Sequence, residues 1–228
     1  MSGIFYFAAN AIGRPEDTSP RALELLKTCD VVCFEEDKGA RITLRQAGIH
    51  REYLKFTEHK EKIALSEIEN ALKNNQSVIY MSDQGASNLA DPGHDLIKLA
   101  NQCNAKMRII PGPSSVTAAL MACPFACKRF YFMGFLPREK EKRELELRNI
   151  CHAISDPIVL LETPYRREAF LDSLQQVLKT TRRIFLAFDI SCENEHYFTG
   201  TAQECVAMAK NLSKDLNFVC IVEGRKNI

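Results

Sequence analysis

Two short runs of small and polar residues each follow a β-like apolar stretch and precede a helix-like pattern. The first, residues 82–93, reads Ser-Asp-Gln-Gly-Ala-Ser-Asn-Leu-Ala-Asp-Pro-Gly, and the second, residues 111–115, reads Pro-Gly-Pro-Ser-Ser. Open α/β sheets bind their ligands at the carboxyl ends of parallel strands. We therefore expect these runs to be loops at the ends of neighbouring strands, where small residues let a ligand approach the backbone closely.

Chain length and composition fit a globular protein of one large or two modest domains. The chain has 228 residues, of which 46% are hydrophobic and 26% are charged, as in ordinary globular proteins. Its formal charge of +1 gives no global field for nucleic acid, although a local basic patch remains open. No apolar run approaches the roughly 20 residues that span a bilayer. The first residues also lack the pattern of a leader peptide, so a cytoplasmic location is expected.

The nine cysteines form no recognisable disulfide or metal pattern. Their number is odd and their positions are scattered, unlike a disulfide framework. Cys29 and Cys33, like Cys123 and Cys127, have a C-x3-C spacing, but no His or Cys at matching spacing completes a zinc site. We expect the cysteines to be small buried apolar residues and expect no metal.

Strand-like runs alternate with helix-like runs, a pattern typical of α/β folds. Strands are expected at 3–9, 31–35, 52–56 (an edge strand), 77–81, 106–110, 129–133, 157–161, 183–188, 195–199 and 217–223. Helices are expected at 20–27, 41–47, 59–74, 92–103, 114–122, 138–152, 165–178 and 201–211. The irregular segment 123–129 separates two expected α/β domains, 1–124 and 125–228, with mostly parallel or mixed sheets and a ligand cleft between them.

Two of the expected helices begin with capping signals. Ser19 and Asp91 are the expected N-cap residues, and each is followed by a proline that would be the first helical residue. The first strand is not followed by a Gly-x-Gly-x-x-Gly fingerprint, and the chain contains no P-loop. These absences argue against ordinary dinucleotide binding and against NTP hydrolysis.

Five motifs follow one another in the order found in a known family. The residues that carry them are Ile12, Gly13 and Asp17, then Ser82, Asp83, Gly85 and Asp91–Gly93, then Ile110–Ser114, Gly134–Pro137 and Glu162–Arg166. From about Phe5 to Gly224 the chain resembles the tetrapyrrole-methylase-like (class III) S-adenosylmethionine-dependent methyltransferases. Within them it is most similar to the branch that methylates a cytidine ribose 2′-oxygen in 16S ribosomal RNA. It departs from that branch at Asn10, Gln84, Ala86, Ser87 and Ala90 and in the eroded segment Phe188–Cys192.

The resemblance implies two α/β domains with S-adenosylmethionine (S-adenosyl-L-methionine) in the cleft between them. It also implies a homodimer, no metal, and ribosomal RNA or the small ribosomal subunit as partner. Longer members carry a small additional C-terminal domain beyond the point where this sequence ends. Two alternatives stay open. The same fold could act on a tetrapyrrole or another small molecule, or the chain could be a catalytically silent protein that binds S-adenosylmethionine.

Candidate site residues lie in these motifs. Asp83 could accept a hydrogen bond from the ribose or amino group of the cofactor, or it could cap its own turn. Glu162 and Arg166 could orient the acceptor or supply a base, or they could form a plain intrahelical ion pair. The catalytic candidates are Glu162, Arg166 and, at another strand end, Asp189. The expected cofactor-binding residues are Asn10, Ser82, Asp83, Gly85, Asn88, Pro111, Ser114, Ser115 and Thr163.

A charged helix is expected directly after the Gly-Phe-Leu-Pro motif. Its cations could meet RNA phosphates, but glutamates are interleaved with them. A solvated face with i,i+4 ion pairs is therefore the favoured interpretation. The cations are Arg138, Lys140, Lys142, Arg143 and Arg148.

Overall fold

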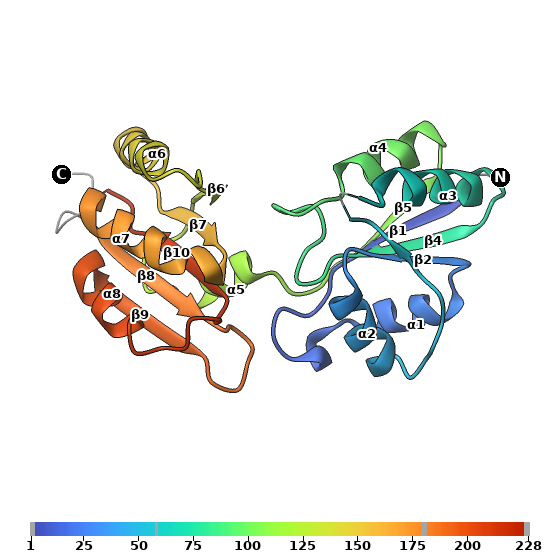
Figure 1. Ribbon diagram of the computed structural model, residues 1–228, viewed down its shortest axis with the longest axis horizontal. Coiled ribbons are helices and arrows are strands. Elements are labelled where there is room, and N and C mark those ends of the chain that lie inside the picture. Colours follow the sequence, from blue (N-terminus) through green and yellow to red (C-terminus); the bar gives the residue numbers. More distant parts are fainter. Residues whose placement is uncertain (1–2, 58, 179–181, 226–228) are drawn as a thin grey trace. The chain divides into compact units, whose positions relative to one another are not determined.

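The structure of the chain, a computed structural model, describes residues 3–57, 59–178 and 182–225. The chain divides into two compact units, Met1–Ser114 and Ser115–Ile228. In the described residues each unit contains one five-stranded sheet covered by helices (Figure 1). The α/β class expected from the alternating sequence pattern is therefore confirmed.

The first unit has a parallel sheet between two layers of helices. In spatial order its strands are β3 (Leu54–Lys55), β2 (Val31–Phe34), β4 (Ser77–Met81), β1 (Ile4–Ala8) and β5 (Lys106–Ile110). One face is covered by α1 (Pro20–Thr28) and α2 (Asp37–Gln46), the other by α3 (Glu61–Lys73) and α4 (His94–Gln102) (Figure 1). A short 3-10 helix, η1 (Pro15–Asp17), precedes α1. The inner strands β1, β2 and β4 are mostly buried and have nearly continuous apolar sequences, whereas the edge strand β5 contains Lys106 and Arg108.

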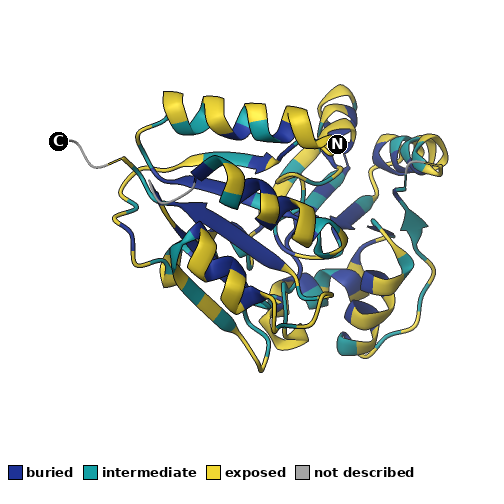
Figure 2. Ribbon diagram, turned by 60° about the vertical axis from the view of Figure 1, so that its left-hand side comes forward, coloured by how far each residue is buried: buried dark blue, intermediate teal, exposed yellow. Residues whose placement is uncertain are grey.

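The second unit has a mixed sheet. Its strands are, in spatial order, β6 (Tyr131–Phe135), β7 (Ile158–Glu162), β10 (Phe218–Val222), β8 (Arg183–Phe188) and β9 (His196–Thr201), and only the β6–β7 pair is parallel. Helices α6 (Lys140–Ala153), α7 (Arg167–Leu178) and α8 (Ala202–Ala209) pack on one face, and a 3-10 helix, η2 (Pro164–Arg166), precedes α7. Figure 2 shows the buried strands beneath helices whose outer faces are exposed.

Helix α5 (Ser115–Ala122) belongs to the second unit. Its buried residues Val116 and Ala119 pack with apolar side chains of β7, β8 and β10, on the face opposite α6, α7 and α8. By internal packing the chain divides into its two compact units between residues 114 and 115, whereas the sequence pattern places the boundary at 124/125. In the sequence, the loss of helical periodicity after residue 122 indicates a loop and therefore a boundary there. The packing of α5 against β7, β8 and β10 instead assigns this helix to the second unit.

Most expected elements occur within a few residues of their expected bounds. The main shift is α2, which begins at Asp37 instead of residue 41 because Gly39 and Ala40 are already buried against the sheet. Ser19 occupies the expected N-cap position of α1, although its hydroxyl makes no capping hydrogen bond.

The arginine at position 143 is part of the core and not of a solvated cationic face. Arg143 is only 3% exposed, and its guanidinium donates to Ser173 Oγ (3.0 Å) and to the carbonyl oxygens of Pro137, Arg138 and Ala169. The other cations of α6 agree with the expectation. Lys140 and Arg148 form i,i+4 pairs with Glu144, and Lys142 pairs with Glu139. Arg143 thereby holds the loop after β6 against α7.

We predict that Arg143→Met lowers the free energy of unfolding by about 2–3 kcal/mol, because it leaves buried carbonyl groups without donors. Urea denaturation measures the change. Lys142→Met, on the exposed face of the same helix, is the matched control and should change stability by less than about 0.5 kcal/mol. Equal effects of the two substitutions would contradict this role of Arg143.

Candidate functional site

Three loops of the first unit meet at the carboxyl end of its sheet. They follow β1, β4 and β5, and the strand order places β1 between the other two. The two loops singled out in the sequence are therefore not on neighbouring strands, which corrects that expectation. The β1 loop lies between them and contacts both: Ala9 N donates to Ile110 O (3.1 Å), and Asn10 pairs with Gly85.

β1 and β4 are neighbouring strands whose following crossovers run over opposite faces of the sheet. From β1 the chain crosses through α1 to β2, and from β4 it crosses through α4 to β5, on the opposite face and in the opposite direction. The loops after β1 and β4 thus separate to the two sides of the sheet. Such a switch point, outside the carboxyl ends of the strands, is where doubly wound sheets bind ligands.

Asn10 binds the loops at this switch point to each other. Its backbone exchanges two hydrogen bonds with Gly85, of 2.9 and 3.1 Å. Its buried side-chain amide donates to Thr43 Oγ1 and to the carbonyl oxygens of Ser82 and Asp83. The amide oxygen accepts from Ala11 N (2.9 Å) and from Thr18 Oγ1 (3.0 Å). Both the nitrogen and the oxygen of its amide are bonded within the protein, so Asn10 fixes the positions of the loops that form the site.

The β4 loop carries its own internal bonds. The hydroxyl of Ser82 is fully buried and interacts with Ser87 Oγ (3.2 Å). Gly85 has φ +72°, a conformation that L side chains rarely adopt, and a Cβ there would lie 3.3 Å from the side chain of Ile12. Asn88 and Ala90 also have positive φ values of 70° and 63°. The loop is therefore held in a conformation that costs free energy, as is common where a loop binds ligands.

Asp83 connects the ends of β2 and β4. Its Oδ1 accepts from Glu36 N (3.1 Å), and its own N–H donates to Glu35 Oε2 (3.2 Å). The carboxylate thus bonds to the β2 loop instead of capping its own turn. Burial raises the pKa of the Asp83 carboxyl. Helix α2 reaches this carboxylate at Gly39, where a Cβ would lie 2.5 Å from Asp83 Oδ1.

The expected N-cap at Asp91 is wrong. Helix α4 begins at His94, and its N-cap is Gly93 with φ +155°. A Cβ at Gly93 would lie 3.2 Å from Asn88 Cβ and 3.3 Å from the Phe7 ring. Only glycine fits both the positive φ angle and the lack of space for a Cβ at position 93, so the helix begins after it. The carbonyl oxygen of Pro92, just before this glycine, accepts a hydrogen bond from the Tyr80 hydroxyl (3.1 Å).

Asp91 belongs to an acidic cavity that sequence reasoning missed. The cavity has a volume of about 360 Å³ and is lined by Glu35, Glu36, Phe56, Thr57, Glu61, Asp91, Pro92, Gly93, His94 and Asp95. Burial, together with the charges of Glu35 and Asp83, raises the pKa of the Asp91 carboxyl to about 7. Burial also raises the pKa of Glu35. One sequence feature could have indicated this cavity: Glu35 and Glu36 directly follow β2, a strand of the same parallel sheet.

The remaining expected binding residues of the first unit lie around these loops. Asn88 and Pro111 are exposed, and Ser114 is half-buried, with its Cα 4.0 Å from a Cβ built at Gly85. Ser115 is half-buried and begins α5 of the second unit. Their part in binding a cofactor stays a prediction.

In the second unit, Glu162 and Arg166 form a buried ion pair. Glu162 ends β7 and Arg166 lies in η2, so the pair joins a strand to the following turn and is not intrahelical. Arg166 Nη2 is 3.0 Å from Glu162 Oε2, and the two side chains are 14% and 0% exposed. The contact is not aligned as a hydrogen bond, and Oε2 has no hydrogen-bond partner. Glu162 Oε1 accepts from the N–H and the hydroxyl of Thr163.

Arg166 also connects the pair to the Gly-Phe-Leu-Pro loop. Its Nη2 donates to the carbonyl oxygens of Leu136 (2.8 Å) and Pro137 (3.1 Å). Asp189, the third catalytic candidate, follows β8 at the same end of the sheet, with β10 between it and Glu162. Two strand spacings separate these positions, about 10 Å. Asp189 Oδ1 accepts from Asn217 N (2.9 Å).

The structure also bears on disulfides, metal ligands and membrane-spanning helices. The nine cysteines are free, and four of them, Cys29, Cys33, Cys205 and Cys220, are buried. In the described residues no group of three or more His, Cys, Asp or Glu side chains is placed to hold a metal ion. No helix in the described ranges is long and apolar enough to cross a membrane.

We predict that Gly39→Ala destabilises the protein by about 1–3 kcal/mol, because the new methyl group overlaps the Asp83 carboxylate. In an unconstrained helix the same change stabilises by about 0.5–1 kcal/mol, so the sign of the effect is informative. Urea unfolding of the single and double variants measures the coupling to Asp83→Ala. The second substitution should recover part of the loss, and strict additivity would contradict the overlap.

We predict that Asp91→Asn removes a pH-dependent loss of stability. The folded-state pKa of about 7 lies above the unfolded value of 3.8, so the folded protein binds this proton more tightly. The associated stability is present below pH 4 and is lost as the pH rises to 7. Asn stays neutral, so the variant should exceed the parent by about 1–2 kcal/mol at pH 8, after allowance for solvent screening, and by less at pH 5.

Urea unfolding at both pH values measures this difference. Asp172→Asn, on the exposed surface of α7, is the control and should show no such change between pH 5 and pH 8. A gain for Asp91→Asn that is the same at both pH values would contradict the prediction.

Comparison with known proteins agrees with the geometry. A model of the family described as Tetrapyrrole (Corrin/Porphyrin) Methylases matches residues 5–206. The Ribosomal RNA small subunit methyltransferase I of Synechocystis sp. is 28% identical over 222 residues, which cover 97% of this chain and 79% of that protein. The protein of the same name from Thermotoga maritima is 30% identical over 207 residues, covering 90% and 91%.

Solved structures show the same fold. A cobalt precorrin-4 methyltransferase superposes with a TM-score of 0.70 at 13% identity, covering 97% of this chain and 94% of that one. The uroporphyrin-III-C-methyltransferase from Thermus thermophilus gives 0.63 at 14% identity, with the same coverage. The family match spans most of the chain and the fold agrees with it, so the chain belongs to the tetrapyrrole (corrin/porphyrin) methylase family and is a methyltransferase.

Proposed function

We propose that this methyltransferase uses S-adenosylmethionine to methylate a ribose 2′-oxygen of small-subunit ribosomal RNA, as a cytoplasmic homodimer. The observation that carries the proposal is the joining of the β1, β4 and β5 loops at the switch point of a methylase-family sheet. The printed names of the relatives support ribosomal RNA as the acceptor. The solved structures named for tetrapyrrole-type substrates are 13% and 14% identical to this chain, a level at which the likeness supports the fold alone.

The residues around the switch point fit such a donor. S-adenosylmethionine, when bound, supplies a methyl group activated by a positively charged sulfonium sulfur. The Gly85 and Gly112 positions present backbone without side chains, and a Cβ at Gly112 would lie 3.0 Å from the Ala9 methyl. The half-buried Asp83 can accept from hydroxyl or amino groups. Carboxyl groups with raised pKa values, at Asp83 and Asp91, favour a ligand that brings positive charge.

Glu162 is the proposed group that takes the proton of the acceptor. A ribose hydroxyl is a poor nucleophile until its proton is removed. Oε1 of Glu162 is occupied by Thr163, whereas Oε2 is buried and has no hydrogen-bond partner in the described structure. In the proposed reaction Oε2 would accept the hydroxyl proton, while S-adenosylmethionine would supply the methyl group and leave as the neutral thioether, the electron pair of the S–CH3 bond returning to sulfur. Arg166, fixed by two carbonyl groups, holds the carboxylate in place.

We predict that Glu162→Gln lowers the rate of methyl transfer by about 100-fold or more, because the amide cannot take the proton. Affinity for S-adenosylmethionine, measured by calorimetry, should change by less than about threefold. Glu168→Gln, an exposed carboxylate paired with Lys214, is the matched control and should leave the rate unchanged. Asp189→Asn tests the competing candidate. A larger effect there than at Glu162 would transfer the role to Asp189.

The overall proposal is tested with labelled S-adenosylmethionine and 30S particles from cells that lack this protein. Transfer of label to 16S ribosomal RNA, mapped to one ribose by mass spectrometry, is the expected result. Transfer to precorrins instead would favour the small-molecule alternative. Calorimetric binding of the donor without transfer to any ribosomal substrate would favour the catalytically silent protein. The absence of heat at high micromolar donor would contradict all three alternatives.

A further inference from the structure

The second unit contains a cavity with several cationic side chains, at the end of the sheet opposite Glu162. It is lined by Arg148, Cys151, His152, Val177, Leu178, Arg182 and Arg225 and has a volume of about 340 Å³. It lies where α6 and α7 end, β8 begins and the chain leaves β10. β7 begins at this end of the sheet with Ile158 and ends at Glu162, a rise of about 13 Å.

Among the described residues, the lining contains three arginines and no acidic side chain. Two nearby carboxylates are already paired. Glu144 lies 3.2 Å from Arg148 and offsets part of its charge, and Glu223 pairs with Arg183 outside the cavity. In a chain whose net charge is only +1, this is a local concentration of positive charge, and such concavities attract anions.

Arg182 is the central residue of the cavity. It is 9% exposed, and it donates from Nε to Glu223 O (2.7 Å) and from Nη1 to Cys151 O (3.0 Å). Its Nη2 is buried and has no hydrogen-bond partner in the described structure. Buried donors without partners are rare and costly. Burial, with a contribution from the charge of Arg225, lowers the pKa of the Arg182 guanidinium.

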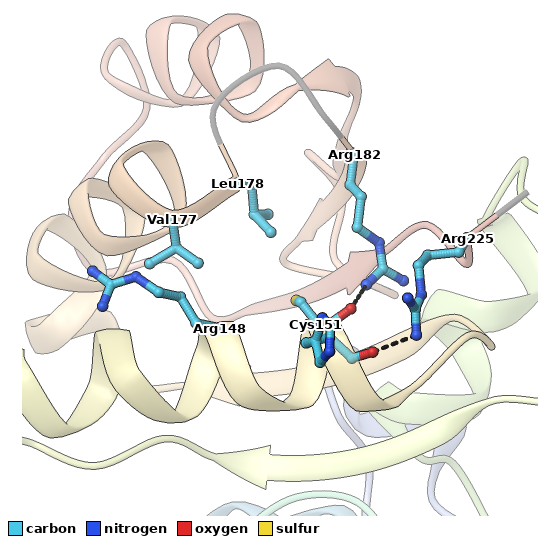
Figure 3. Close-up of a pocket in the computed structure, with 7 residues that line it drawn as sticks. Arg148, Cys151, Val177, Leu178, Arg182 and Arg225 are labelled. Atoms are coloured by element: carbon cyan, nitrogen blue, oxygen red, sulfur yellow. Dashed lines mark hydrogen bonds between the residues drawn. The ribbon is translucent and has the colours of Figure 1, made fainter.

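Figure 3 shows how the arginines lie. Arg182 and Arg225 approach the last turn of α6, where Arg225 donates to His152 O. Arg148 lies farther back on α6, below Val177. Capping the end of α6 accounts for one donor of each of the first two arginines. It accounts neither for Nη2 of Arg182 nor for the cavity bounded by Val177 and Leu178.

We propose that this cavity is a binding site for a phosphate group, with Arg182 and Arg225 as its main donors and Arg148 as a second cationic contact. Guanidinium groups bind phosphate oxygens through charge-assisted and often paired hydrogen bonds. The volume is that of a small-ligand pocket, so the phosphate belongs either to a free small anion or to an RNA backbone that reaches this end of the unit. The inference does not depend on the proposed methyl transfer.

The test measures phosphate binding to the full chain by NMR at constant ionic strength, with inorganic phosphate up to about 10 mM. We expect saturable shifts of the backbone amides of Cys151, Leu178 and Arg182. Arg148→Gln and Arg225→Gln alter exposed side chains, so the fold should be retained, and each should weaken binding about tenfold. Arg129→Gln, an exposed arginine elsewhere in the unit, is the matched control and should bind as the parent does.

A second arm uses a short single-stranded RNA. Saturable binding of inorganic phosphate at these residues supports a free anion as ligand. Binding of RNA alone, weakened by the same two substitutions and not by Arg129→Gln, supports a phosphodiester. The proposal is overturned if neither probe binds, or if both bind the Arg148→Gln, Arg225→Gln double variant as tightly as the parent. Donor binding and methyl transfer are measured separately, so failure here leaves the proposed function untouched.

Discussion

The amide of Asn10 is the contact on which the candidate site of the first unit depends. Parallel strands bring loops to the same edge of a sheet, but they do not hold those loops together. Asn10 does so because its side chain has two donor hydrogens and an acceptor oxygen, which reach Thr43, Ser82 and Thr18 at once. Asn10 is one of the positions at which the sequence departs from the branch that it resembles. A hydroxyl side chain has one donor hydrogen and could not make all of these contacts at once.

Electrostatics in the same unit oppose that stabilisation. Glu35, Asp83 and Asp91 end up close together and partly buried, and the pKa of each is raised. Carboxylates in such surroundings repel one another and lose hydration, which lowers the stability of the folded state at neutral pH. Backbone N–H groups of Asp83 and Glu36 offset part of this cost by donating to the carboxylates. The proposed cationic donor would be stabilised by this cluster of carboxylates, and its binding would offset the repulsion between them.

The sequence was sufficient for properties that depend on local pattern. The parallel strands 77–81 and 106–110 have their expected bounds: the first is apolar from Val78 onward, and the second ends in Ile109 and Ile110 directly before Pro111. Tertiary contacts decided the rest. Asp91 looks like an N-cap, but the crowding of Phe7 and Asn88 around Gly93 moves the helix start. Arg143 looks like a surface cation, and only the position of α7 reveals that its guanidinium is buried. Likewise, no local signal in the sequence shows that β1 lies between β4 and β5.

Buried arginines organise the second unit mainly through carbonyl oxygens. Arg143, Arg167 and Arg182 donate to the ends of helices and to loops, and none of the three forms a salt bridge in the described structure. Carbonyl groups satisfy the hydrogen bonds of a guanidinium without neutralising its charge. Glu162 neutralises Arg166 at one end of the sheet, whereas the described residues that line the cavity at the other end include no acidic side chain. Guanidinium–carbonyl bonding therefore leaves one end of the sheet with a paired carboxylate and the other with excess positive charge. A phosphate bound there would accept the hydrogen bond that Nη2 of Arg182 does not make within the described structure.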